Sequence, residues 1–208
     1  MLNYLLKHMM SLYFNGCSNT WGGELDNLDD RYSKIVCDHY GIEDYNHAEC
    51  GRSNDKITCS TIKQIDRNEI DWVIIQFTIP SRYRWFDDRG REHHWTPTDR
   101  NKKNYNSFAR NQWYKYVYNR RIGVENTWKN IFLFDNYCKS VGQKYIALIA
   151  DLWSDDLDID AHWKKMPFPT RMHRDIIQDE SLLLEHKHPS PEGHKKIAEF
   201  IIEHVDSH

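Results

Sequence analysis

Two uninterrupted apolar runs constrain the fold of this chain more than any other feature. Residues 71–78 (DWVIIQFT) and 144–150 (KYIALIA) carry apolar side chains at consecutive positions instead of alternating them with polar ones. Consecutive β-branched and aromatic residues indicate a strand that is buried on both faces, as in a parallel sheet covered by helices. The rest of the chain must therefore supply helices for both faces of a sheet.

Segments with helical spacing alternate with the candidate strands. Two short runs, 11–15 and 44–49, are further strand candidates, and apolar residues recur at helical intervals in 25–40, 54–67, 128–141 and 190–205. This alternation predicts an α/β fold with a doubly wound parallel sheet between two helical layers. We expect a single domain over residues 1–208, with a candidate N-terminal extension at 1–9. Residues 80–124 form an insertion too long for an ordinary connection, with a helix of its own near 108–121.

The composition excludes several classes of protein. Aromatic residues make up 13% of the chain, which argues against disorder, and no segment resembles a transmembrane span. The chain has 28 Lys and Arg against 31 Asp and Glu, so it is not a general nucleic-acid binder. Five cysteines without a CxxC pair indicate free thiols in a reducing compartment. Because no clean signal peptide precedes the first strand, we expect a cytoplasmic protein.

The near-neutral total hides one basic segment. Residues 80–122 hold eleven Lys and Arg against four Asp and Glu, together with ten aromatic residues. We expect most of these aromatic residues to form a small core within the insertion, and the remainder to line a wall that recognises a sugar ring or an anionic group. Nucleic-acid binding by basic and stacking side chains is a third interpretation, which we do not expect.

Three polar segments follow predicted strands, where open α/β sheets bind ligands. In residues 16–22 (GCSNTWG), glycines flank Ser18, and such a turn exposes a hydroxyl beside backbone N–H groups that can stabilise an oxyanion. Gly51 allows a ligand close to the backbone, and Asn54 is a polar neighbour. Thr78 and Arg82 are suited to an anionic or carbonyl group. The alternatives are helix caps for the first two segments and a surface arginine for the third.

A fourth polar segment precedes the last predicted helix. Glu185 lies three residues before His188, and a carboxylate that accepts the Nδ1 proton leaves Nε2 free to act as a base for a serine. The alternatives are a polar loop and a metal site formed by His186, His188 and His194. We expect no metal, because no Cys or Asp cluster accompanies these histidines.

Taken in order, these segments resemble the SGNH (GDSL-like) hydrolases. Gly16-Cys17-Ser18 is similar to the Gly-Asp-Ser block after the first strand of that family, with Cys17 in place of Asp. Gly51 corresponds to the second-block glycine, and Glu185-x-x-His188-Pro189 resembles the Asp-x-x-His-Pro block. The resemblance covers residues 12 to about 202 and implies a flavodoxin-like sheet. The variant blocks resemble a bacteriophage-encoded subgroup, which would put the protein in the host cytoplasm or the virion.

The third block departs from the family pattern. After residues 71–75 the family would show Gly-x-Asn-Asp, whereas this chain continues Gln76-Phe77-Thr78-Ile79-Pro80. The side-chain amide of the oxyanion hole is therefore missing from its usual place. Asn54, Thr78 and Arg82 are the candidate substitutes.

The resemblance implies a serine esterase that cleaves acyl esters, with O-acetyl groups on a carbohydrate as the expected substrate. It implies Ser18 as nucleophile, His188 as base and Glu185 as the acid that orients it. The oxyanion hole would comprise Ser18, Gly51 and Asn54, and Thr78 and Arg82 would bind substrate. No cofactor and no membrane partner are expected, and the oligomeric state is left open. The alternative is an SGNH-like scaffold, weakly active or inactive, that serves as a binding or phage structural protein.

Overall fold

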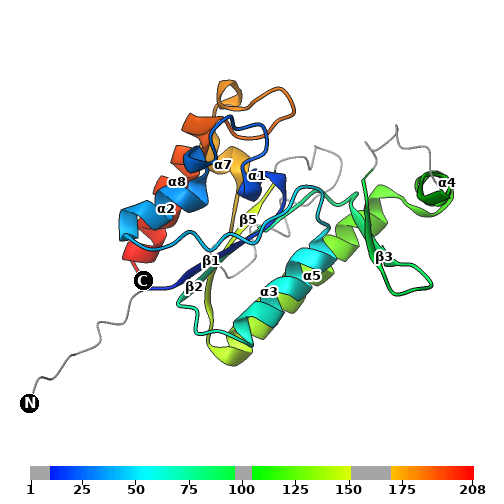
Figure 1. Ribbon diagram of the computed structural model, residues 1–208, viewed down its shortest axis with the longest axis horizontal. Helices are drawn as coiled ribbons and strands as arrows, with labels where there is room; N and C mark the ends of the chain where they lie inside the picture. Colours follow the sequence, from blue (N-terminus) through cyan, green and yellow to red (C-terminus); the bar gives the residue numbers. More distant parts are fainter. Residues whose placement is uncertain (1–9, 97–104, 151–169) are drawn as a thin grey trace, which may run out of the picture.

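A computed structural model describes residues 10–96, 105–150 and 170–208 of the chain (Figure 1). The candidate extension 1–9 and residues 97–104 of the insertion lie outside this part. The main sheet comprises β1 (Leu12–Asn15), β2 (Trp72–Phe77), β5 (Lys144–Ile149) and β6 (Thr170–Met172). The helices around it are α1 (Ser18–Trp21), α2 (Tyr32–Tyr40), α3 (Asn54–Ile65), α5 (Arg120–Val141), α7 (His173–Ile177) and α8 (Pro191–Asp206).

All strand pairs in the main sheet are parallel, and the order is β1-β2-β5-β6. The register pairs Ile74 of β2 with Phe14 on one side and with Ile146 on the other. An isolated parallel bridge joins Phe14 to Asn46, so the segment predicted as a strand at 44–49 lies beside β1 as a single bridge. Counting that bridge, the order is flavodoxin-like, and the predicted α/β fold with a parallel sheet is confirmed.

Helices cover both faces of the sheet (Figure 1). On one face, α3 and α5 pack against alternate residues of the central strands, such as Val73, Ile75 and Ala147. On the other face, α2 and α8 pack against Ile74, Ile146 and their neighbours. The central residues of β2 and β5 are buried on both faces, which is what the uninterrupted apolar runs predict.

Helix ends follow local sequence signals. The Ser53 side chain accepts from Lys56 N at the start of α3, and Ser190 accepts from Gly193 N at the start of α8. Gly41 and Gly142 end α2 and α5 with positive φ values of 66° and 70°. The helix predicted at 25–40 is shorter in the structure, where it is α2, because Asn27 caps a separate 3₁₀ turn, η1 (Leu28–Asp30), ahead of it.

The predicted insertion follows β2 and holds a second, two-stranded sheet. Antiparallel strands β3 (Tyr83–Phe86) and β4 (Glu92–Trp95) form a hairpin, followed by α4 (Tyr105–Gln112) and a π-helical turn, η2 (Trp113–Val117). α5 then begins at Arg120, so its first residues overlap the end of the insertion predicted at 80–124. Figure 1 shows the hairpin and α4 together at one end of the molecule, beyond the start of α5.

Candidate active site

Ser18 is the first residue of α1, immediately after β1. The chain turns at Gly16, where an added Cβ would lie 2.2 Å from Thr20 Oγ1 and 2.9 Å from Gln76 Cβ. A glycine is therefore needed for β1 to enter α1 so sharply. The turn leaves Ser18 at the carboxyl edge of the sheet, with its N–H at a helix start, where backbone donors have no partner within the helix.

His188 is in hydrogen-bond contact with Ser18. The distance from His188 Nε2 to Ser18 Oγ is 2.8 Å, across a sequence separation of 170 residues. Leu184 N donates to His188 O at 2.7 Å and Lys187 N donates to Leu184 O at 2.9 Å, so the backbone of this loop is fixed on both sides of the turn. The structure thus brings together the predicted nucleophile and the predicted base.

The carboxylate at His188 is Glu24, and the prediction of Glu185 in this position is wrong. His188 Nδ1 lies 2.6 Å from Glu24 Oε2, and His186 N donates to both carboxylate oxygens at 3.1 and 3.2 Å. Glu185 is exposed, and among the described residues it makes no hydrogen bond or ion pair with His188. The reason is local: Lys187 has a φ of +64°, so the chain reverses direction between Glu185 and His188.

Electrostatics keep Glu24 ionised. Partial burial raises the pKa of this carboxyl, but the hydrogen bonds with His188 and His186 N outweigh that effect. Together with the nearby histidine charges, they hold the pKa of Glu24 below its ordinary value. An ionised Glu24 accepts the Nδ1 proton of His188 and leaves Nε2 as the atom that faces Ser18.

Two glycines bring Glu24 to this place. Gly22 N and Gly23 N both donate to Ser18 O, at 3.0 and 2.7 Å, and end α1 in a tight turn. A Cβ on Gly23 would lie 3.1 Å from His188 Nε2 and 3.2 Å from Ser18 Cβ. The absence of a side chain at Gly23 thus allows the close approach of the base. The sequence signal for Glu24 is this Gly-Gly-Glu run directly after the nucleophile helix, which motif spacing alone does not single out.

Gly51, a predicted oxyanion-hole residue, has a backbone conformation that favours glycine. Its φ is +82°, and an added Cβ would meet nothing within 4 Å, so the backbone there faces open space. In the described part of the chain, its N–H donates to no acceptor. This donor is therefore available to a substrate.

Asn54 is not available, contrary to prediction. Its Nδ2 donates to Thr78 O at 3.0 Å and to Thr127 Oγ1 at 2.9 Å, and its Oδ1 accepts from Thr78 N at 2.7 Å. The side chain is buried. Both ends of the amide thus join α3 to the end of β2 and to α5, and no donor remains for an oxyanion.

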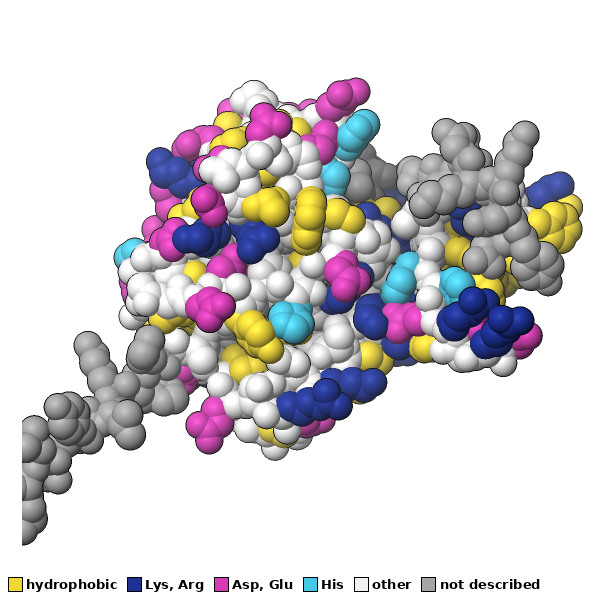
Figure 2. All heavy atoms as spheres, viewed as in Figure 1, with side chains coloured by type: hydrophobic (Ala, Val, Ile, Leu, Met, Phe, Trp, Pro, Cys, Tyr) yellow, Lys and Arg dark blue, Asp and Glu magenta, His cyan; other side chains and the backbone are white. Residues whose placement is uncertain are grey.

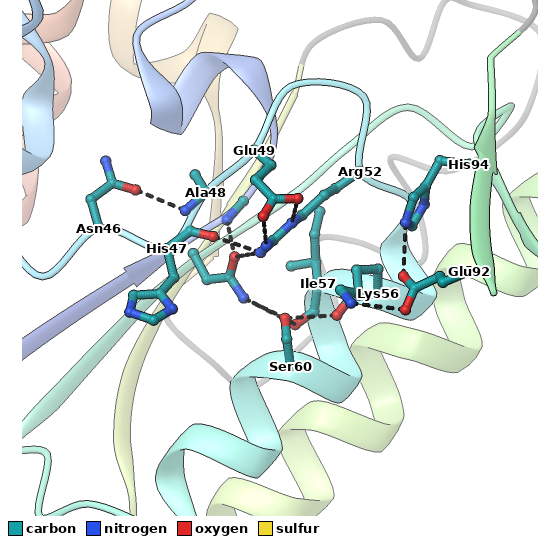
Figure 3. Close-up of polar contacts among 12 residues, drawn as sticks. Asn46, His47, Ala48, Glu49, Arg52, Lys56, Ile57, Ser60, Glu92 and His94 are labelled. Carbon is teal, nitrogen blue, oxygen red and sulfur yellow. Dashed lines mark hydrogen bonds and ion pairs between the residues drawn. The ribbon is translucent and has the colours of Figure 1, made fainter. Parts of the chain in front are cut away.

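Polar contacts centred on Arg52 hold the loop that carries Gly51 (Figure 3). Arg52 Nη1 donates to His47 O at 2.6 Å and to Asn15 Oδ1 at 3.0 Å, while its Nε donates to Glu49 Oε2 at 2.9 Å. Asn46 Nδ2 donates to Thr20 O at 2.8 Å. The loop is therefore tied both to the end of β1 and to α1, next to Ser18.

Thr78 and Arg82 lie at the same sheet edge, after β2. Arg82 Nη1 donates to Thr78 Oγ1 at 2.8 Å and to Arg52 O at 3.4 Å. Gln76, which stands where the resemblance would put a glycine, is fully buried, and its Oε1 accepts from Thr20 Oγ1 at 2.7 Å. Gln76 thus belongs to the interior, whereas Arg82 is only partly buried.

Cys17 experiences the charge of Arg82. Burial by itself raises the pKa of the Cys17 thiol, but the positive charge of Arg82 and hydrogen bonds involving Thr78, Asn19 and Ser18 lower it below its ordinary value. Arg82 therefore acts electrostatically on the residue directly before Ser18.

The aromatic residues of the insertion pack largely on one another. The Tyr83 and Trp113 rings stack with centroids 4.2 Å apart, and Trp85 and Trp95 lie 5.0 Å apart. Phe108 and Tyr116 stay exposed beside a pocket of about 430 Å³ that also includes Trp95 and Trp113. Figure 2 shows Lys and Arg side chains gathered over the outer part of this insertion. Most of these aromatic residues thus form the small core predicted for the insertion, whereas Phe108 and Tyr116 remain on its surface.

Several solved structures share this fold. One is a lipolytic protein of the G-D-S-L family from Desulfitobacterium hafniense (TM-score 0.58, 14% identity, 93% of this chain and 98% of that chain). Another is the psychrotrophic esterase EstA from Pseudoalteromonas sp. (TM-score 0.58, 10% identity, 95% of this chain and 97% of that chain). A third is a catalytic mutant of Axe2, an acetylxylan esterase from Geobacillus stearothermophilus (TM-score 0.57, 12% identity, 93% of this chain and 93% of that chain). The fold is that of the GDSL/SGNH hydrolases.

Sequence comparison adds no assignment to this likeness. No protein-family model matches the chain, and no curated protein matches it. Within residues 10–96, 105–150 and 170–208, no group of three or more His, Cys, Asp or Glu is arranged to hold a metal ion. None of the helices described is long and apolar enough to cross a membrane.

Proposed function

We propose that this protein is a serine esterase that cleaves acyl esters with a Ser18–His188–Glu24 triad. The observation that carries the proposal is the pair of contacts at His188, 2.8 Å to Ser18 Oγ and 2.6 Å to Glu24 Oε2. Nucleophile, base and orienting acid within hydrogen-bond reach are what acyl transfer requires. The fold shared with GDSL esterases supports the same reaction class.

In the proposed reaction, Ser18 Oγ attacks the ester carbonyl while His188 Nε2 takes its proton. The carbonyl π electrons move to the oxygen, and the N–H groups of Ser18 and Gly51 donate hydrogen bonds to the resulting oxyanion. The C–O bond to the alcohol then breaks, and His188 returns the proton to the leaving oxygen. Water then attacks the acyl group on Ser18 in the same way, with His188 as base, and the carboxylic acid product is released. Throughout, Glu24 holds the His188 tautomer and stabilises the imidazolium.

O-acetyl groups on a carbohydrate are the substrate we propose. Axe2 is an acetylxylan esterase, and a second structure of similar fold is a two-domain esterase active on acetylated mannans. The exposed aromatic residues Phe108 and Tyr116 in the insertion offer apolar surface of the kind that packs on sugar rings. The proposed link to a bacteriophage-encoded subgroup, and with it a place in the host cytoplasm or the virion, rests on the variant blocks alone.

The test is hydrolysis of p-nitrophenyl acetate by the wild type, Ser18→Ala and Ser140→Ala. Ser140 is an exposed serine on α5, which makes it a matched control. We expect Ser18→Ala to lose at least about 10³-fold in kcat and Ser140→Ala to match the wild type. A fluorophosphonate should add one phosphonyl group to Ser18, detected by peptide mass spectrometry. Equal activity of wild type and Ser18→Ala, or a wild type that neither turns over nor is labelled, would favour the scaffold alternative.

A further inference from the structure

Arg82 lies at the edge of the sheet that holds the candidate site and is a cation with no carboxylate partner among the described residues. Its nearest cationic neighbours are paired: Arg52 with Glu49 and Arg84 with Glu92. Among the described residues, Arg82 has no ion pair and binds only the neutral oxygens Thr78 Oγ1 and Arg52 O through Nη1. Because the described residues place no carboxylate in ion-pair contact with this partly buried guanidinium, some of its five N–H donors are left over for a ligand.

The contacts of Arg82 place its guanidinium where the loops of the site converge. Thr78 directly follows β2, and Arg52 directly follows Gly51 in the loop between the Asn46 bridge and α3. The effect of its charge on Cys17 adds the third loop, the one that leads into Ser18. The three loops lie at the carboxyl ends of β1, β2 and the segment bridged to β1 at Asn46, where an ester bound to Ser18 would present its carbonyl oxygen.

Neither amide side chain near the end of β2 can serve the oxyanion. Asn54 uses both ends of its amide on Thr78 and Thr127. Gln76 Nε2 has no hydrogen-bond partner among the described residues, but the side chain is fully buried with its oxygen held by Thr20, so it is out of reach of a substrate. With the two backbone donors alone, the developing negative charge would lack a side-chain donor, and loss of one such donor costs on the order of 10²–10³ in kcat.

We propose that the Arg82 guanidinium donates to the oxyanion of the tetrahedral intermediate, completing the oxyanion hole with the N–H groups of Ser18 and Gly51. This assignment rests on the serine-esterase function proposed above. A charge-assisted hydrogen bond suits the step, because the carbonyl oxygen gains a full negative charge only when Ser18 has attacked. The interaction is thus weak towards the bound ester and strong towards the intermediate, and it acts mainly on kcat.

The test uses Arg82→Ala and Arg82→Lys with p-nitrophenyl acetate, a neutral ester that offers no anionic group for recognition. We expect Arg82→Ala to lose about 10²–10³-fold in kcat with KM changed by less than about three-fold. Added guanidinium chloride at millimolar concentration should restore part of the activity of Arg82→Ala, and Arg82→Lys should retain an intermediate kcat. Arg121→Gln, which removes an exposed arginine on α5, is the matched control and should leave kcat unchanged.

Three outcomes overturn this assignment, and they are distinguishable. If Arg82→Ala keeps the wild-type kcat while Ser18→Ala is inactive, the esterase stands and Arg82 is not an oxyanion donor. If KM rises and kcat is kept, Arg82 binds the substrate in its ground state instead. If the wild type neither turns over nor is phosphonylated at Ser18, the proposed function fails and takes this assignment with it. A melting temperature for each variant separates loss of the donor from loss of the fold.

Discussion

Glu24 adopts a backbone conformation that few residues other than glycine adopt. Its φ is +66°, and Lys187, on the opposite loop, has a φ of +64°. Such conformations cost on the order of 1–3 kcal/mol and persist where the surrounding structure holds them in place. Here one lies at the carboxylate that contacts His188 and the other immediately precedes His188. The two loops are thus bent so that Glu24, His188 and Ser18 meet.

Substitution of the acid tests its identity directly. Glu24→Gln keeps the shape of the side chain but removes the charge that holds the His188 tautomer, so we expect kcat to fall by roughly 10²–10⁴-fold. Glu185→Gln, in contrast, should stay close to the wild type because this residue is exposed and away from His188. Initial rates on p-nitrophenyl acetate make the comparison. The reverse ranking would restore Glu185 as the acid.

Sequence reasoning located some site residues and missed others for a physical reason. Ser18 and His188 lie next to glycine, proline and cap signals that act over a few residues, and such signals are visible in sequence. The Glu24–His188 contact spans 164 residues and depends on how two loops approach each other in space. The role of Asn54 likewise depends on Thr127, 73 positions away on α5. Local patterns carry no information on either distance.

At the scale of single elements, the β3–β4 hairpin is attached to the body of the protein through Glu92. Its Oε2 accepts from Lys56 Nζ at 2.8 Å, while its Oε1 lies 2.8 Å from His94 Nε2 (Figure 3). Lys56 belongs to α3, so the contact joins the insertion to the helix that follows the Gly51 loop. Partial burial raises the pKa of Glu92, but Lys56 and Arg84 outweigh that effect and bring the pKa to about 2.

This depressed pKa predicts a pH-dependent stability. A carboxyl whose pKa is lower in the folded state stabilises the fold above its ordinary value of 4.5, and loses that contribution as the pH falls towards about 2. The difference in free energy of unfolding between the wild type and Glu92→Gln should therefore be constant above about pH 5 and shrink towards zero near pH 2. Urea unfolding followed by tryptophan fluorescence across this range provides the measurement. A difference that does not change with pH would show that Glu92 acts through its shape alone.

The elements that sequence reasoning found are those with strong periodicity. The apolar runs at 71–78 and 144–150 became β2 and β5, because burial on both faces leaves a continuous pattern. The hairpin was missed, because its strands mix charged and aromatic residues and are only partly buried. The predicted strand at 44–49 is a single bridge at Asn46, although Phe14 N donates to Tyr45 O and His47 N donates to Phe14 O along β1.

At the scale of the whole molecule, the last helix, α8, closes one face of the sheet. Ile197 and Ile201 of α8 are fully buried in the same cluster as Ile74 and Ile146. α8 also fixes the loop before it: Ser190, its N-cap, donates through its backbone N to Leu182 O at 2.7 Å. The position of His188 thus depends on the docking of α8.

Truncation of this buried face should lower stability without a direct effect on the chemistry. Ile201→Ala is expected to lower the free energy of unfolding by about 2–5 kcal/mol, the usual range for a large buried aliphatic side chain. Leu133→Ala on α5, where Leu133 is 49% exposed, should change it by less than about 0.5 kcal/mol. Denaturant unfolding measures both. For folded molecules well below the melting temperature, kcat should be the same in the two variants, and a large fall in kcat with Ile201→Ala would show that α8 does more than support the loop.

Ser18 and Glu24 are six residues apart, whereas His188 comes from the other end of the described chain, 170 residues from Ser18. The consequence concerns synthesis. In the proposed esterase, Ser18 and Glu24 are made early but cannot act until the loop that carries His188 has been synthesised and has docked against them. Hydrolysis of a chromogenic ester by that esterase would therefore report that the two ends of the described chain have come together.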